Sequence, residues 1–195
     1  MDARQRRSRD ALGRAVLRLA AERPISAISA SEIAQLAELN RSTFYQHAES
    51  PADLLRLIIT EQLDAVRTRY LEGATRETIG EAIGASTSAV LDHVERYDQV
   101  YIRALGAEGE SALHSTLSRH FRASIELLFD RGALTMPGGE FVRSAASRFI
   151  ADGSVGLMDF WLRTPAPRDR GVYLRAFMEL TPEWWPVQTE PARLG

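Results

Sequence analysis

Residues 29–47 read SASEIAQLAELNRSTFYQH, and this stretch decides the fold. Ser29 and Glu32 have the spacing of a capping box, in which each side chain accepts the backbone N–H of the other residue. Asn40 offers a second N-cap, directly before a segment that runs through His47. The spacing therefore predicts a short helix over about residues 30–37, a tight turn, and a second short helix from Asn40 to His47, as in a helix-turn-helix.

Outside this stretch the apolar residues recur with helical spacing almost everywhere. Leu12, Ala15, Val16, Leu19 and Ala20 form the buried stripe of a helix that Pro24 must end. Ser50 and Pro51 cap a long amphipathic helix at its start. No segment alternates apolar and polar residues for long enough to predict a strand.

The sequence thus predicts an all-α protein of about nine helices. A three-helix helix-turn-helix DNA-binding domain is expected over residues 1–50, and a helical ligand-binding and dimerisation bundle over residues 51–195.

The second short helix has two contrasting faces. At about 100° per residue, Phe44 and Ala48 fall together on the inner face. They are expected to pack against Ile33 and Leu36 of the preceding helix.

The outer face of the same helix is polar. Ser42 and Gln46 point outward, and Thr43 and Tyr45 lie on the two flanks. A Gln side chain can bond an adenine edge in both directions, and Ser, Thr and Tyr hydroxyls suit bases or phosphates. The alternative is a small helical bundle whose polar face is only solvated.

These residues together resemble the TetR family of bacterial transcriptional regulators. The resemblance covers roughly the first quarter of the chain and joins Ser29–Ala37, Arg41–His47 and Ser50-Pro51. It implies contacts of Thr43, Tyr45 and His47 with the DNA backbone, of Ser42 and Gln46 near base edges, and of Ser29 next to a phosphate. The predicted DNA-binding residues are therefore Ser29, Arg41, Ser42, Thr43, Tyr45, Gln46 and His47.

Three positions depart from the family pattern. Glu38 stands where a glycine is usual in the turn, and Ala48 where a Phe is usual. Ala52 stands where the family often has a phosphate-binding Lys.

Charge is distributed unevenly along the chain. Residues 1–47 contain eight Arg against five acidic residues, whereas the whole chain has a formal net charge of −2. A basic N-terminal region on an acidic body is typical of a protein that presents one end to a polyanion. Arg4, Arg6, Arg7 and Arg9 form either a minor-groove arm or a solvated terminus.

A helix-turn-helix usually needs a twin, because specific sites are commonly two half-sites of a palindromic operator. Gly153, Gly156 and Phe160 are the predicted homodimer interface, since the glycines let another backbone approach closely. The resemblance likewise implies that the last two long helices pair with their symmetry mates as a four-helix bundle. Close packing within one chain is the alternative explanation of the glycines.

Several polar and aromatic side chains lie on or beside the apolar stripes of the predicted bundle. Such residues can line a cavity for a mostly apolar molecule held at a few polar points. Each of them, taken singly, also fits an ordinary core position. The predicted site for a small apolar or aromatic effector comprises His93, Tyr97, Tyr101, His120, Phe121, Phe149, Asp152 and Trp161.

Other classes of function find little support. The chain has no Cys, and no two of its four His residues share the i, i+4 spacing of a metal site, so we expect no metal and no cofactor. Asp152-Gly-Ser-Val-Gly156 imitates a hydrolase nucleophile elbow, but its first position must be Gly, so we expect no catalytic residues.

No segment has the length and composition of a signal peptide or a membrane span, so a cytoplasmic protein is expected. The sequence predicts a homodimeric, sequence-specific DNA-binding transcriptional regulator, a repressor that a small apolar or aromatic ligand releases from a palindromic operator. An architectural or dimerisation-only DNA-binding protein without an effector is the alternative, and a small-molecule hydrolase a more distant one.

Overall fold

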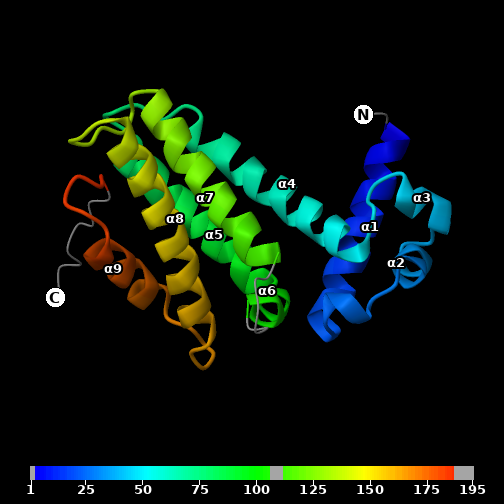
Figure 1. Ribbon diagram of the computed structural model, residues 1–195. Coiled ribbons are helices and arrows are strands. Elements are labelled where there is room, and N and C mark those ends of the chain that lie inside the picture. The colour runs from blue at the N-terminus through cyan, green and yellow to red at the C-terminus, as the bar shows by residue number, and fades with distance from the viewer. Residues whose placement is uncertain (1–2, 106–111, 187–195) are drawn as a thin grey trace. The chain divides into compact units, whose positions relative to one another are not determined.

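The computed structural model describes residues 3–105 and 112–186. Within these ranges the chain forms nine α-helices, one 3₁₀ helix and no strand (Figure 1), which confirms the predicted all-α fold. The elements are α1 (Ala3–Glu22), η1 (Ile25–Ala27), α2 (Ala30–Leu36), α3 (Arg41–Tyr45), α4 (Pro51–Leu71), α5 (Ile79–Arg96), α6 (Asp98–Leu105), α7 (Ala112–Asp130), α8 (Glu140–Leu162) and α9 (Arg170–Leu180).

The chain divides into two compact units. The first unit combines Met1–Gln62 with Val94–Thr116, and the second combines Leu63–His93 with Leu117–Gly195. Helix α6 belongs to the first unit because it packs against α1. The compact units therefore do not follow a boundary at residue 50. That boundary divides the chain by function and stays a prediction.

The first unit is organised around α1, which packs against α2, while α2 packs against α3 (Figure 1). Helix α1 ends at Glu22, before Pro24, as the sequence predicts. A Cβ on Gly13 would lie only 2.9 Å from Ile58 Cδ1, so the glycine lets α1 approach α4 closely. The fully buried side chains of this unit include Leu12, Val16, Ile33, Phe44, Leu54 and Ile59.

Two details of the helix-turn-helix differ from the sequence prediction. Helix α3 ends at Tyr45 rather than His47, and Asn40 makes no capping hydrogen bond with its side chain although its backbone is extended. Phe44 and Ala48 are buried as predicted, whereas Leu36 is 39% exposed. Leu36 is the last residue of α2, where the chain turns away from the unit's core.

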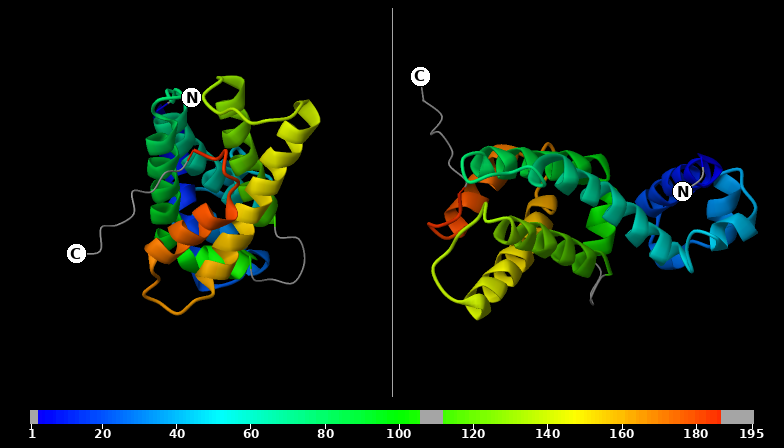
Figure 2. Two further views of the ribbon diagram at one scale, coloured as in Figure 1. Left: turned by 90° about the vertical axis from the view of Figure 1, so that its left-hand side faces the viewer. Right: turned by 90° about the horizontal axis from the view of Figure 1, so that it is seen from above.

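The second unit has a core of its own. Its buried cluster draws residues from the end of α4, from α5, α7 and α8, and from the segment after α9. Helix α8 contacts α9, the helix that follows it in the chain (Figure 2). No helix within the described residues is long and apolar enough to cross a lipid bilayer.

Candidate functional site

Helix α2 begins with the predicted capping box. Glu32 N–H donates to Ser29 Oγ at 3.2 Å, and Ser29 N–H donates to Glu32 Oε2 at 2.9 Å. The Arg23 guanidinium and the Ser29 donors together lower the pKa of Glu32 to about 2. The carboxylate is therefore charged at neutral pH, which suits an acceptor at a helix N-terminus. The Ser29 hydroxyl also donates to Glu32 at 2.8 Å, so this hydroxyl is engaged in the cap itself.

Helix α3 has one buried anchor and a polar outer face. Phe44 is fully buried, whereas Arg41, Ser42, Tyr45 and Gln46 are exposed. Because α3 is short, the Phe44 ring is the main attachment that fixes its orientation in the first unit.

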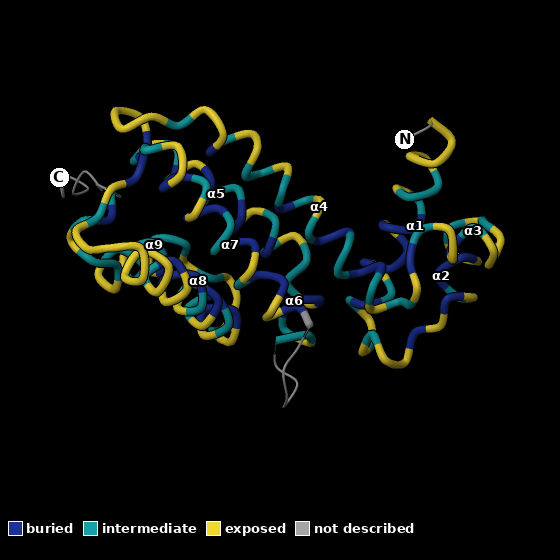
Figure 3. Tube along the Cα trace, turned by 45° about the horizontal axis from the view of Figure 1, so that its top comes forward, coloured by how far each residue is buried: buried dark blue, intermediate teal, exposed yellow. Residues whose placement is uncertain are grey.

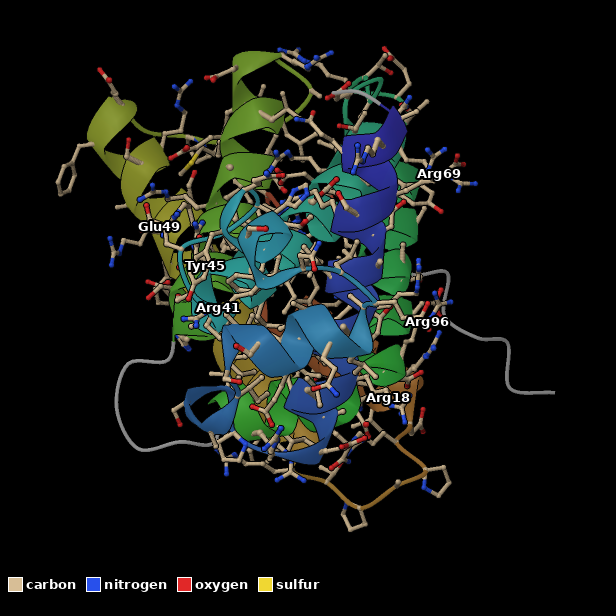
Figure 4. The ribbon with its side chains drawn as sticks, turned by 90° about the vertical axis from the view of Figure 1, so that its right-hand side faces the viewer. Arg18, Arg41, Tyr45, Glu49, Arg69 and Arg96 are labelled. Carbon is tan, nitrogen blue, oxygen red and sulfur yellow. The ribbon has the colours of Figure 1, made fainter. Side chains whose placement is uncertain are left out.

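Arg41 and Tyr45 lie one helical turn apart and interact with each other. Arg41 donates to the Tyr45 hydroxyl at 3.1 Å, and its guanidinium lies 5.4 Å from the centre of the Tyr45 ring (Figure 4). This contact holds a cation and a phenol side by side on the exposed face. Both groups can donate to phosphate oxygens.

His47 lies just after α3 and connects to α1. Its Nε2 is 2.8 Å from Ser8 Oγ, and it is half-buried. Burial, and secondarily the positive charge of Arg9, lower the pKa of His47 below its ordinary value. At neutral pH His47 is therefore uncharged and hydrogen-bonded to Ser8 of α1. In this state it is a weaker phosphate-binding group than its position in the sequence predicts.

The first turns of α1 add cations that the predicted set of DNA-binding residues does not include. Arg4, Arg6 and Arg7 are exposed and lie on α1, which is helical from Ala3 onward. Since Ser8 contacts His47, these arginines lie on the same part of the first unit as the end of α3. The sequence shows that these arginines are clustered, but only the contact of Ser8 with His47 shows that they lie near the end of α3.

The second unit contains a cavity of about 80 Å³ that is partly open to the surface. Its apolar wall comes from the C-terminal end of α4 and from α5, α7, α8 and α9, with Trp185 beyond them. Its polar atoms come from Ser86, Thr87, His120, Ser124, Ser154 and Tyr173. A mostly apolar wall with a few polar groups is typical of a small-molecule site.

The structure brings together only part of the predicted effector site. His120 and Phe121 line the cavity. The remaining six predicted residues lie outside its lining, and they fall into different environments: His93, Tyr97, Tyr101, Phe149, Asp152 and Trp161.

Four of the six have clear alternative roles. Tyr101 is a fully buried core residue of the first unit, and Phe149 is 76% exposed. Asp152 accepts a hydrogen bond from Ser118 and pairs with Arg148. Trp161 is buried and donates to the Asp169 carbonyl at 3.2 Å.

Sequence reasoning missed cavity residues on all five helices of the wall, including those on the inner faces of α8 and α9. Ile150, Ser154 and Met158 recur at intervals of four, and Tyr173 and Phe177 repeat the same interval on α9. The signal was present as a second apolar stripe on α8. Periodicity could not decide which of the two stripes faces the core.

His120 is a buried polar group of the cavity wall. Its Nδ1 lies 3.2 Å from Asp64 Oδ1 and 3.4 Å from Arg67 NH1, both on α4, and Asp64 and Arg67 pair at 2.9 Å. Burial lowers the pKa of His120, although the Asp64 carboxylate opposes this effect. His120 is therefore neutral at neutral pH.

The outer face of α8 carries the predicted dimer residues. Gly153, Gly156 and Phe160 are exposed, and a Cβ on either glycine would meet no atom within 4 Å. The glycines therefore do not serve close packing against any of the residues that the structure describes. Figure 3 marks further exposed residues along α8 and α9, which include Phe141, Phe149, Val172 and Leu180.

Comparison with solved structures places this arrangement among known folds. The dihydroxyacetone kinase operon activator DhaS superposes with a TM-score of 0.62 at 12% sequence identity, over 88% of this chain and 94% of its own. A TetR transcriptional regulator from Rhodococcus sp. RHA1 gives 0.59 at 17% identity, over 90% and 96%. Thermus thermophilus FadR, a TetR family repressor in complex with lauroyl-CoA, gives 0.56 at 19% identity, over 96% and 100%.

The chain has a TetR-like fold. No family model matches its sequence, and no curated protein matches it significantly. The likeness therefore lies in the arrangement of helices rather than in the sequence as a whole.

The TetR-like fold gives the three departures in the sequence a structural setting. Glu38 has a φ of 56°, in the left-handed region where the family's usual glycine is unstrained. Ala48 is buried, and Ala52 is exposed at the start of α4. The turn thus has the left-handed backbone conformation that favours glycine, but a glutamate occupies the position.

Proposed function

We propose that this protein is a TetR-family transcriptional regulator that binds a specific DNA operator through α3. The observation that carries the proposal is the short helix anchored by buried Phe44, with Ser42 and Gln46 exposed beside the Arg41–Tyr45 pair. Gln can bond both an acceptor and a donor on adenine, and the neighbouring side chains can position the helix through phosphates. As a DNA-binding regulator it is expected to act in the cytoplasm.

The test is selection of binding sites from random duplex DNA. The wild-type protein should return a palindromic motif with two half-sites about one helical turn apart. Gln46→Ala should relax the base preference at one position of each half-site, at a cost of about 1–3 kcal/mol. Gln99→Ala, an exposed Gln on α6, is the matched control and should leave the motif unchanged. An unchanged motif with Gln46→Ala would show that Gln46 does not read a base.

Homodimerisation through α8 and α9 is part of the proposal. The exposed α8 face combines two glycines with large aromatic side chains, including Phe160 at 71% exposure. Val172 and Leu180 extend the exposed apolar surface onto α9. Apolar side chains of this size and number on one face are typical of an interface between protein chains. A two-fold contact would bring two copies of α3 to the two halves of a palindrome.

The proposal further assigns repression and release by an effector to the second unit. Its support is the cavity with few polar groups, together with the likeness to a repressor whose structure contains lauroyl-CoA. An effector that favours the non-binding form lowers DNA affinity, and DNA lowers effector affinity by the same factor. The coupling typical of such systems is about 1–3 kcal/mol, or roughly 5- to 150-fold.

The effector step is tested by titrating compounds with and without operator DNA. Tryptophan fluorescence reports on the second unit, because all three Trp residues of the chain lie there: Trp161, Trp184 and Trp185. A compound that binds this unit and weakens operator binding supports the effector role. If compounds bind but operator affinity stays within twofold, the second unit serves dimerisation alone.

The hydrolase alternative loses support at Ser154. This residue lies within α8, so no strand precedes it, and its hydroxyl donates to the Ile150 carbonyl at 2.6 Å. A hydroxyl bonded to its own helix is poorly placed to act as a nucleophile.

A further inference from the structure

The cavity of the second unit is uncharged. Among the described residues, no Arg, Asp or Glu side chain lines it. An ionised ligand group buried there would lose its hydration without gaining a partner of opposite charge, which is strongly unfavourable. The wall therefore disfavours carboxylates, phosphates and ammonium ions and favours a neutral molecule.

His120 offers this wall a hydrogen-bond acceptor. Both Asp64 Oδ1 and Arg67 NH1 lie near its Nδ1, and the two neighbours demand opposite roles of that nitrogen. Asp64 determines whether Nδ1 is protonated. Its carboxylate, paired with Arg67, can only accept a hydrogen bond and would repel an unprotonated nitrogen at 3.2 Å. The proton therefore sits on Nδ1, and Nε2 has a lone pair to offer.

Aromatic rings form another part of the wall. Tyr173 and Phe177 stack with ring centres 6.5 Å apart, and Phe177 meets Trp185 edge to face at 6.4 Å. Trp185 is only 8% exposed, and its Nε1 is buried without a hydrogen-bond partner among the described residues. Together these rings give a ligand an aromatic surface to contact.

The size of the cavity restricts the ligand further. At about 80 Å³ it is smaller than the cavity of roughly 150 Å³ that holds benzene in another protein. A single-ring molecule can be fully enclosed only if wall side chains move outward. Met158 is an unbranched, adaptable side chain of the wall that can make this room.

We propose that the effector is a compact neutral phenol whose hydroxyl donates to His120 Nε2 while its ring contacts Tyr173 and Phe177. This inference rests on the proposed function, since it names the ligand of the same cavity. Asp64 is a positioning residue in this arrangement, because it holds the proton on Nδ1 and keeps Nε2 free to accept.

Three matched probes test the inference on the full-length protein: 4-methylphenol, 4-methylanisole and 4-methylbenzoate. The anisole lacks the donor, and the benzoate carries a charge. By calorimetry, 4-methylphenol should bind about tenfold tighter than 4-methylanisole, the worth of one hydrogen bond. It should bind at least about 100-fold tighter than 4-methylbenzoate.

Two variants connect the preference to His120. His120→Phe keeps a ring but removes the acceptor, so the phenol-to-anisole ratio should fall to about one while anisole affinity is maintained. Asp64→Asn should lower the same ratio about threefold, because the proton is no longer held on Nδ1. Asp64 is partly exposed, so this variant gives a readout even if His120→Phe does not fold.

The inference is overturned if the benzoate binds tightest, if neither variant changes the ratio, or if none of the three probes binds. Operator selection without ligand separates these failures from those of the proposed function. A specific operator without phenol binding removes only the ligand assignment. Phenol binding without a specific operator removes the regulator and leaves the cavity assignment standing.

Discussion

The first and second units build their sites in opposite ways. The candidate DNA-binding site of the first unit, α2 and α3, comes from one stretch of fewer than twenty residues, with its cap, turn and anchor adjacent in sequence. The cavity of the second unit collects its wall from five helices and Trp185. Local capping and turn geometry therefore govern one site, whereas long-range packing governs the other. Substitutions that act on one unit alone test this contrast.

Phe44→Ala should have the largest effect. Removing a fully buried Phe costs about 3–5 kcal/mol, because a cavity replaces its contacts. Since the three Trp residues all lie in the second unit, circular dichroism should show early melting of the first unit while Trp fluorescence melts later. Tyr45→Ala, at the exposed neighbouring position, is the control and should leave both melting curves nearly unchanged. Equal shifts of both signals with Phe44→Ala would mean that the units unfold as one.

Gly156→Leu should dissociate the dimer and weaken operator binding at least about 100-fold, because each half-site alone holds a monomer poorly. The monomer should remain folded, since there is open space at this position and Leu favours helix over Gly. Sedimentation velocity measures the assembly. Gly84→Leu is the matched control, as a helical glycine of α5 that also has open space. A Gly156→Leu variant that stays dimeric would place the interface elsewhere.

Arg4→Ala combined with Arg7→Ala should lower DNA affinity by about tenfold at low salt. If both contact phosphates, the slope of log affinity against log salt should fall by about 1.8, or roughly 0.9 for each lost contact. Filter binding over a range of salt concentrations measures the slope. The control is Arg14→Ala with Arg18→Ala, which removes two exposed arginines farther along α1. Equal slopes for both pairs would mean that the start of α1 has no special role.

Glu38→Gly should have the smallest effect and the opposite sign. A side chain at a φ of 56° is strained, so glycine should raise the free energy of unfolding by about 0.5–1 kcal/mol. Chemical denaturation followed by circular dichroism measures the change. Glu49→Gly, at an exposed position without a positive φ, should be neutral or destabilising. A loss of stability with Glu38→Gly would show that the turn is not strained.

Most of the helix-turn-helix can be derived from the sequence, although α3 ends at Tyr45 rather than at His47. The capping box, the end of α1 before Pro24 and the buried Phe44 all depend on residues within a few turns of one another. Propensity, capping and side-chain period act over the same short range, so these features can be derived from residue order. The exposure of Leu36 could not be predicted in this way, because it depends on where α2 ends relative to the core.

The tertiary structure alone decided the cavity and the two faces of α8. Phe149 and Ile150 are neighbours in the chain, yet Phe149 faces outward and Ile150 lines the cavity. Helix α8 has apolar residues on both sides, so its pattern does not distinguish an intrachain core from an exposed apolar face. The role of His120 likewise depends on Asp64, 56 residues earlier in the chain. Such long-range contacts form only when helices pack together. The spacing of apolar residues within one helix does not indicate which other helix packs against it.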